Sequence, residues 1–100
     1  MGVETVVNDP EAAKKYKEEG NEAFQKGEYE NAIKLYTKAI QSTHDETLEK
    51  ATYYKNRAAA YLKLKKYEKV IKDATSALDI SPNDPKALYR RCQALESLER

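Results

Sequence analysis

AKKYKEEGNEAFQKGEYENAIKLYTKAIQSTH (residues 13–44) and ATYYKNRAAAYLKLKKYEKVIKDATSALDISP (residues 51–82) are two diverged copies of one unit. Nine of the 32 aligned positions are identical, and others, such as Gly20/Ala58 and Phe24/Leu62, differ conservatively. Self-similarity at a period of roughly 20–50 residues is typical of solenoids, in which each unit packs on the next. Solenoids present long concave surfaces to other chains, so the repetition favours a binding function.

Apolar residues within the repeats recur at helical spacing, and no segment shows a strand signal. We expect an all-α solenoid of antiparallel helical hairpins, with helices over residues 10–26, 29–42, 46–64, 67–78 and 85–100. Asp9-Pro10 and the matching Asn83-Asp84-Pro85 favour helix starts, because Pro fits the first helical position. Thr43 with Glu46 has capping-box spacing, and Asp45 could cap equally well, so we expect the third helix to start near residue 46.

The composition excludes several classes of function. The chain has 100 residues, 35% of them charged, and a net charge of +1, which argues against duplex nucleic acid as a partner. No apolar run is long enough to span a membrane, and the first ten residues lack the basic start of a secretory signal. The lone Cys92 cannot form an internal disulfide, which fits a reducing compartment, so we expect a cytoplasmic protein.

No constellation for catalysis is present in the sequence. One His, one Cys and three Gly leave no catalytic triad, no metal-ligating cluster and no phosphate-binding glycine loop. We therefore predict that the chain is not an enzyme, and that it has no catalytic residues, metal site or cofactor.

The sequence resembles the tetratricopeptide repeat, which has a period of about 34 residues. The resemblance implies that residues 1–9 are a flexible lead and that residues 10–100 form the repeat domain. Within it, repeat one covers about 13–46, repeat two covers about 51–84, and a partial third repeat covers 85–100. Gly20, Ala58 and Cys92 occupy the small positions at which helix backbones approach closely. The positions that carry the resemblance are Tyr16, Gly20, Tyr29, Ala32, Tyr36 and Ala39, then Tyr54, Ala58, Tyr61, Tyr67, Ala77 and Pro82.

Five polar residues lie on the first helices of the repeats. Four of them form two pairs, one on the first helix and one on the fifth, and residues four apart share a face of a helix. The remaining residue is an asparagine on the middle helix, whose amide would lie between the two pairs. Stacked helices lie about 8–10 Å apart, so we expect the five side chains to converge on one patch. They are Lys17 with Asn21, then Asn56, then Lys86 with Arg90.

This patch resembles the carboxylate clamp of tetratricopeptide co-chaperones, matching all five positions. The resemblance implies that it binds the C-terminal Glu-Glu-Val-Asp tail of heat-shock protein 90 and/or 70. A terminal Asp offers two neighbouring carboxylates, which Lys and Arg attract and which Asn amides hydrogen-bond without added repulsion. The groove positions, with Lys14, Glu18 and Glu96 included, hold six positive and two negative residues. The auxiliary groove residues implied are Phe24, Lys55, Leu62, Lys63, Tyr89 and Gln93.

A narrower resemblance concerns the run from Lys86 to Glu96, KALYRRCQALE, together with YKNRAA from Tyr54 to Ala59. Both are similar to the UCS family of myosin-directed chaperones, which implies a myosin-handling region after this domain. Two alternatives stay open: a general scaffold for internal peptides, or the chaperone-targeting arm of an enzyme such as an immunophilin or a phosphatase.

The fifth helix has no hairpin partner in this sequence. Repeat arrays need about three units and an end cap to cover their apolar faces, so we expect the domain to be C-terminally truncated. The helix would then fray or self-associate with another copy through Leu88, Leu95 and Leu98.

Overall fold

The computed structural model describes residues 8–99 and contains five α-helices in that range. The helices are α1 (Pro10–Gln25), α2 (Tyr29–Gln41), α3 (Leu48–Lys63), α4 (Tyr67–Ile80) and α5 (Pro85–Glu99). No strand occurs among the described residues, and the predicted all-α fold is confirmed. Most of the predicted flexible lead, residues 1–7, lies outside them. No helix in this part of the chain is long and apolar enough to cross a membrane.

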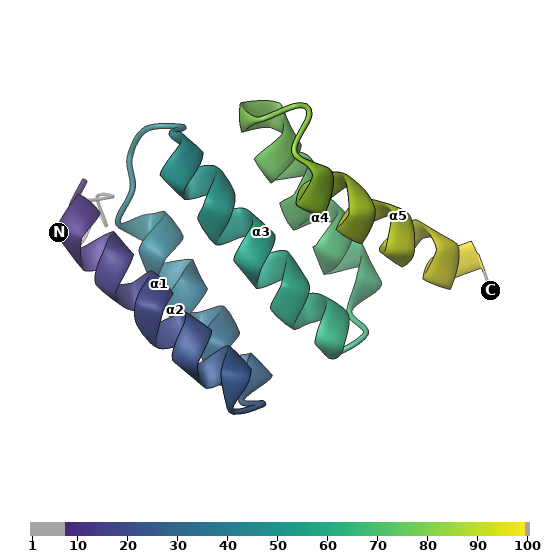
Figure 1. Cartoon of the computed structure of the whole chain (residues 1–100), viewed down its shortest axis with the longest axis horizontal. Coiled ribbons are helices and arrows are strands. Elements are labelled where there is room, and N and C mark those ends of the chain that lie inside the picture. Colours follow the sequence, from purple (N-terminus) through teal and green to yellow (C-terminus); the bar gives the residue numbers. More distant parts are fainter. Residues whose placement is uncertain (1–7, 100) are drawn as a thin grey trace, which may run out of the picture.

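The helices form two antiparallel hairpins, and α5 packs on the second. Each helix packs mainly on its neighbours in sequence, and α3 also contacts α1 and α5. Helices α1, α3 and α5 therefore lie side by side on one face, whereas α2 and α4 lie behind them (Figure 1). This arrangement places the predicted polar pairs of α1 and α5 on either side of α3.

Two helix boundaries differ by two residues from the prediction. Helix α3 begins at Leu48 instead of residue 46, because Thr47 is extended and its hydroxyl accepts a hydrogen bond from the Lys50 amide. Thr43 is not a cap: its hydroxyl is buried and donates to the Ala39 carbonyl, 2.9 Å away. Helix α4 runs to Ile80 instead of residue 78. It stops before Ser81, the residue that precedes Pro82 and is disfavoured in helical geometry.

Small residues allow the helices to approach closely. At Gly20 an added Cβ would lie 2.6 Å from a ring carbon of Tyr36, so only glycine admits this tyrosine against α1. Ala58 is also fully buried, beside Val70. The prediction that Cys92 packs in the same way was wrong: Cys92 is exposed. On α5 the buried small residues are Ala87 and Ala94.

The turns within the two hairpins share one backbone conformation. Gly27 follows α1 with φ of +80°, and Lys65, 38 residues later, follows α3 with φ of +60°. A left-handed residue after a helix allows the chain to reverse while satisfying the last carbonyls. In both turns an amide just beyond that residue returns to the helix, from Glu28 to Ala23 and from Lys66 to Tyr61. The repetition seen in the sequence is therefore present in the backbone as well.

One ion pair links three helices inside the domain. Arg57 of α3 donates from Nε and Nη2 to the two carboxylate oxygens of Asp73 on α4, both at 2.7 Å. Its Nη1 donates to the Thr37 hydroxyl of α2 at 3.0 Å. The Asp73 side chain is only 4% exposed, and that of Arg57 is 18% exposed. Burial opposes the charge of Arg57, but the contacts with Asp73 outweigh it and raise the pKa of Arg57.

We predict that Asp73→Ala lowers the free energy of unfolding by about 3 kcal/mol, because it leaves a buried guanidinium without its carboxylate. The double variant Arg57→Met/Asp73→Leu should recover most of that loss, since both buried charges are removed. Urea denaturation followed by circular dichroism measures both effects. Asp79→Ala on the exposed side of the same helix is the control, with an expected change within about 0.5 kcal/mol. Equal losses of unfolding free energy in the Asp73 and Asp79 variants would contradict the stabilising role of the buried ion pair.

Candidate functional site

Two asparagines from different repeats meet at the centre of the face formed by α1, α3 and α5. Asn21 of α1 accepts a hydrogen bond at its Oδ1 from Asn56 Nδ2 of α3, at 3.4 Å. The same oxygen accepts from the Tyr36 hydroxyl of α2, at 2.6 Å. Because both donors occupy this oxygen, the amide nitrogen of Asn21 is left to donate to a ligand in the groove.

Tyr36 reaches Asn21 from inside the core. Its residue is only 2% exposed, and its ring packs against Gly20. Burial raises the pKa of Tyr36 to about 12, although the positive charge of Arg90 acts in the opposite direction. The hydroxyl therefore stays protonated, as a donor to Asn21, throughout the physiological pH range. The sequence identified Tyr36 only as a position that carries the repeat resemblance, because helical periodicity does not indicate which partner a buried hydroxyl reaches.

Arg90 brings α5 close to the paired amides of Asn21 and Asn56. It is half-buried and donates from Nη1 to the carbonyl of Lys55 on α3, at 3.0 Å. Lys55 directly precedes Asn56, so the guanidinium lies next to the paired amides. Burial lowers the pKa of Arg90, and the nearby carboxylate of Asp84 opposes that shift.

The two clamp lysines flank this centre. Lys17 is half-buried, one helical turn before Asn21, and lines a cleft between α1 and α3. Lys86 is exposed in the first turn of α5, one turn before Arg90. Within residues 8–99, neither ammonium group forms a hydrogen bond or an ion pair. Both charges are therefore available to an anionic ligand.

The predicted auxiliary residues lie in different surroundings. Phe24 is half-buried and packs edge-on against Tyr29, with ring centroids 5.2 Å apart. Leu62 packs beside the buried cluster of Ala58, Val70 and Ala94. Tyr89 is 65% exposed. Lys63 is exposed and Gln93 is half-buried.

Lys55 is not a free cation. Its Nζ donates to Asp84 Oδ2 at 2.6 Å, and the other oxygen of Asp84 accepts from the amides of Lys86 and Ala87. Asp84 thus caps α5 and ties it to α3. The sequence identified Asp84 as a cap, but the ion pair joins residues 29 positions apart, which no local pattern indicates.

The pKa shift of Asp84 follows from its contacts with Lys55 and with the amides of Lys86 and Ala87. Burial would raise the pKa of Asp84, but the hydrogen bond and charge of Lys55, with the two amide donors, lower it overall. Among the described residues, no group of three or more His, Cys, Asp or Glu is arranged to hold a metal ion. The site therefore consists of hydrogen-bond donors and positive charges, which suits an anionic ligand.

Comparison with known families agrees with the repeat architecture. Residues 2–93 match the tetratricopeptide repeats described for BSK1-like serine/threonine-protein kinases. This chain belongs to the tetratricopeptide repeat family. The match includes Asn21, Asn56 and Arg90.

Several individual relatives of this tetratricopeptide domain are known. It is 50% identical over 82 residues to protein unc-45 homolog B of Xenopus laevis, covering 82% of this chain and 9% of that protein. It is 39% identical over 99 residues to the human mitochondrial import receptor subunit TOM70, covering 98% of this chain and 16% of that protein. The second tetratricopeptide domain of Spaghetti (RPAP3) was solved bound to the HSP90 peptide SRMEEVD. It superposes on this chain with a TM-score of 0.80 at 39% identity, and the match covers 88% of this chain and 78% of that domain.

We predict a pH-dependent contribution of Asp84 to stability. Its pKa is lower in the folded domain, so the stabilisation is present above the unfolded pKa and is lost as pH falls through the folded value. Asp84→Asn keeps a capping side chain but removes the charge, and should cost about 1 kcal/mol near neutral pH. The difference between wild type and variant in urea denaturation should shrink as the pH is lowered below about 4. Asp79→Asn is the control. A stability difference between wild type and Asp84→Asn that persists at low pH would contradict the role of the Asp84 charge.

Proposed function

We propose that this tetratricopeptide domain is a co-chaperone adaptor that binds the C-terminal Glu-Glu-Val-Asp tail of heat-shock protein 90 and/or 70. The side chains that would contact the terminal carboxylates come from three helices. They are Lys17, Asn21, Asn56, Lys86 and Arg90.

The observation that carries the proposal is the junction of Asn21, Asn56 and Arg90. The two amides are linked at 3.4 Å, and Arg90 reaches the backbone of Lys55, beside Asn56. Donors from three sequence-distant helices therefore face one small region of the groove, flanked by the uncompensated charges of Lys17 and Lys86. A single carboxylate would not need this many donors, whereas the two carboxylates of a terminal aspartate would use them.

The relatives support the same class of ligand. The RPAP3 domain carries an HSP90 peptide that ends in Glu-Glu-Val-Asp, and this chain covers 78% of that domain at 39% identity. The likeness to unc-45 homolog B supports a role within a myosin-folding chaperone, which this domain would serve in the cytoplasm. The chain spans 9% of that relative's length.

We propose no chemistry for the domain, because its site offers donors and charges without a nucleophile or general base. The scaffold alternative differs from this proposal in its ligand, because a scaffold for internal peptides predicts no preference for a free C-terminus. The alternative of a chaperone-targeting arm of an enzyme requires the same ligand, so peptide binding does not separate it from the adaptor. Self-association through α5 stays a prediction. Its side chains Leu88, Leu95 and Leu98 are exposed.

The expected affinity is moderate. Hydrogen bonds to charged groups contribute about 1.5–3 kcal/mol each, but ordering a flexible tail offsets much of this gain. We therefore expect a dissociation constant of about 1 μM, or roughly −8 kcal/mol. The groove is open to solvent, so added salt should weaken the interaction.

We predict that a peptide ending in Glu-Glu-Val-Asp binds at least about tenfold more tightly than its C-terminally amidated form, because amidation removes one of the two gripped carboxylates. Lys86→Ala should reduce the preference for the free acid, and within residues 8–99 its side chain makes no hydrogen bond or ion pair whose loss would confuse the result. Isothermal titration calorimetry measures both effects. Lys72→Ala, an exposed lysine on α4, is the matched control. Equal binding of the acid and the amide would overturn the proposal.

We also predict that Tyr36→Phe weakens binding of the acid-terminated peptide about fivefold, the equivalent of one neutral hydrogen bond of about 1 kcal/mol. The ring that packs on Gly20 is retained, whereas the donor that orients Asn21 is lost. Calorimetry gives the affinity, and NMR of the Asn21 side-chain amide reports its orientation directly. An unchanged affinity together with an unchanged Asn21 resonance would contradict this role for Tyr36.

A further inference from the structure

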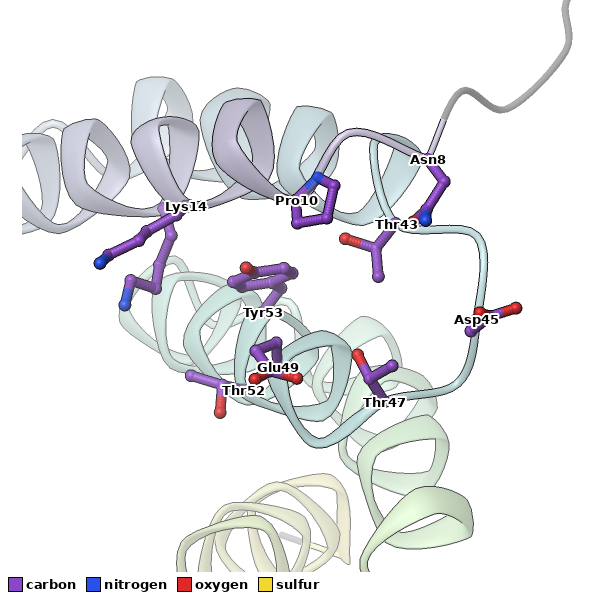
Figure 2. Close-up of a pocket in the computed structure, with 10 residues that line it drawn as sticks. Asn8, Pro10, Lys14, Thr43, Asp45, Thr47, Glu49, Thr52 and Tyr53 are labelled. Atoms are coloured by element: carbon purple, nitrogen blue, oxygen red, sulfur yellow. The ribbon is translucent and has the colours of Figure 1, made fainter.

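A second concave feature lies beyond the clamp, between the N-terminal halves of α1 and α3. It is a cleft of about 490 Å³, bordered by α1, the loop before α3, and the first two turns of α3 (Figure 2). Cavities of about 300–1,000 Å³ accommodate small ligands or short peptide segments. The residues that matter for its chemistry are Pro10, Lys14, Lys17, Glu49, Thr52 and Tyr53.

The cleft has opposite charges on its two sides. Lys14 and Lys17 extend from α1, whereas Glu49 belongs to α3 and Asp45 to the loop before it. Elsewhere oppositely charged residues pair directly, as Lys55 does with Asp84 and Arg57 with Asp73. Within residues 8–99, no ion pair joins either lysine to Glu49. Both signs of charge are therefore available to an occupant of the cleft.

Tyr53 forms the apolar floor. Its residue is only 4% exposed and packs with Ala13 and Ala39, while its ring lies opposite Pro10 across the cleft (Figure 2). Among the described residues its hydroxyl has no hydrogen-bond partner, and it is not sealed from solvent. Burial, with a smaller contribution from the charge of Glu49, raises the pKa of Tyr53. The hydroxyl is therefore a protonated donor, in a residue that is otherwise fully packed.

The cleft shares Lys17 with the proposed clamp but extends from it towards the N-terminal ends of α1 and α3. The auxiliary residues Phe24, Leu62 and Gln93 lie towards the C-terminal ends of their helices, on the other side of Asn21 and Asn56. A tail that ends at those amides would not continue into the cleft. An occupant would thus be a different segment, and its binding would not require a free C-terminus.

We propose that this cleft is a second peptide site, which takes an internal segment with an acidic residue, then an apolar ring, then a basic residue. The acidic side chain would lie against Lys14, and the ring would insert between Pro10 and Tyr53. The basic side chain would lie against Glu49. Charge complementarity at both sides, around an apolar floor with an unpartnered donor, distinguishes this site from a solvated surface.

The test is a titration of the ¹⁵N-labelled chain with acetyl-Glu-Phe-Arg-amide, followed by amide chemical shifts. This probe has no free C-terminus, so it lacks the terminal carboxylate that the clamp would bind. We expect shifts at Lys14, Thr47 and Tyr53 and a dissociation constant of about 1 mM. Acetyl-Gln-Phe-Gln-amide, which keeps the ring without the charges, should bind at least about fivefold more weakly, the equivalent of about 1 kcal/mol.

Two variants examine the charges separately. Lys14→Gln should weaken the charged probe about threefold or more, whereas Lys15→Gln, an exposed lysine beside it outside the cleft, should not. Glu49→Gln should weaken acetyl-Glu-Phe-Arg-amide but not acetyl-Glu-Phe-Gln-amide. The proposal is overturned if the shifts cluster at Asn21, Asn56 and Arg90, if the neutral probe binds equally well, or if the Lys14 and Lys15 variants behave alike.

Discussion

The contact between Gly20 and Tyr36 couples the core of the domain to its binding face. The tyrosine ring occupies space that any side chain at residue 20 would fill, so it sets the separation of α1 and α2. The hydroxyl at the end of that ring donates to Asn21, the next residue along α1. One buried side chain therefore fixes both the helix spacing and the direction in which a surface amide donates. A change that moved α2 would also disturb the groove, although α2 contributes no side chain to the proposed contacts.

Charged contacts hold the successive helices in register. Arg57 ties α3 to α4 and α2 through Asp73 and Thr37, and Lys55 ties α3 to α5 through Asp84. Arg90 then returns from α5 to the Lys55 carbonyl. Residues 55 and 57 thus connect α3 to every other helix except α1, and Asn56 between them makes that last connection through Asn21. This stretch of three residues positions the amide that lies in the middle of the proposed clamp.

Much of the fold follows from patterns that are local or periodic. The repeat, the helical spacing of apolar residues and the Asp-Pro starts were sufficient to predict five helices and their pairing. The start of α3 lies two residues later than expected, because the capping-box spacing of Thr43 and Glu46 drew attention away from Thr47, which also carries a hydroxyl that can cap. Only the path of the loop decides that Thr47 caps while Thr43 turns back to Ala39. Cys92 was misplaced for a related reason: the repeat alignment identifies a small position, but the face of α5 that is covered depends on which helices lie against it.

The electrostatics of the groove show why site residues were harder to predict than helices. Counting charges along the first helices treats Lys55 as a free cation, but the structure pairs it with Asp84 from the loop before α5. Positive charge is therefore concentrated at Lys17 on one flank and at Lys86 and Arg90 on the other, with neutral amides between them. Such spacing limits repulsion among the cations in the empty groove while leaving each able to approach one carboxylate. Two anions a few ångströms apart would match this distribution, whereas a single isolated anion would engage only one flank.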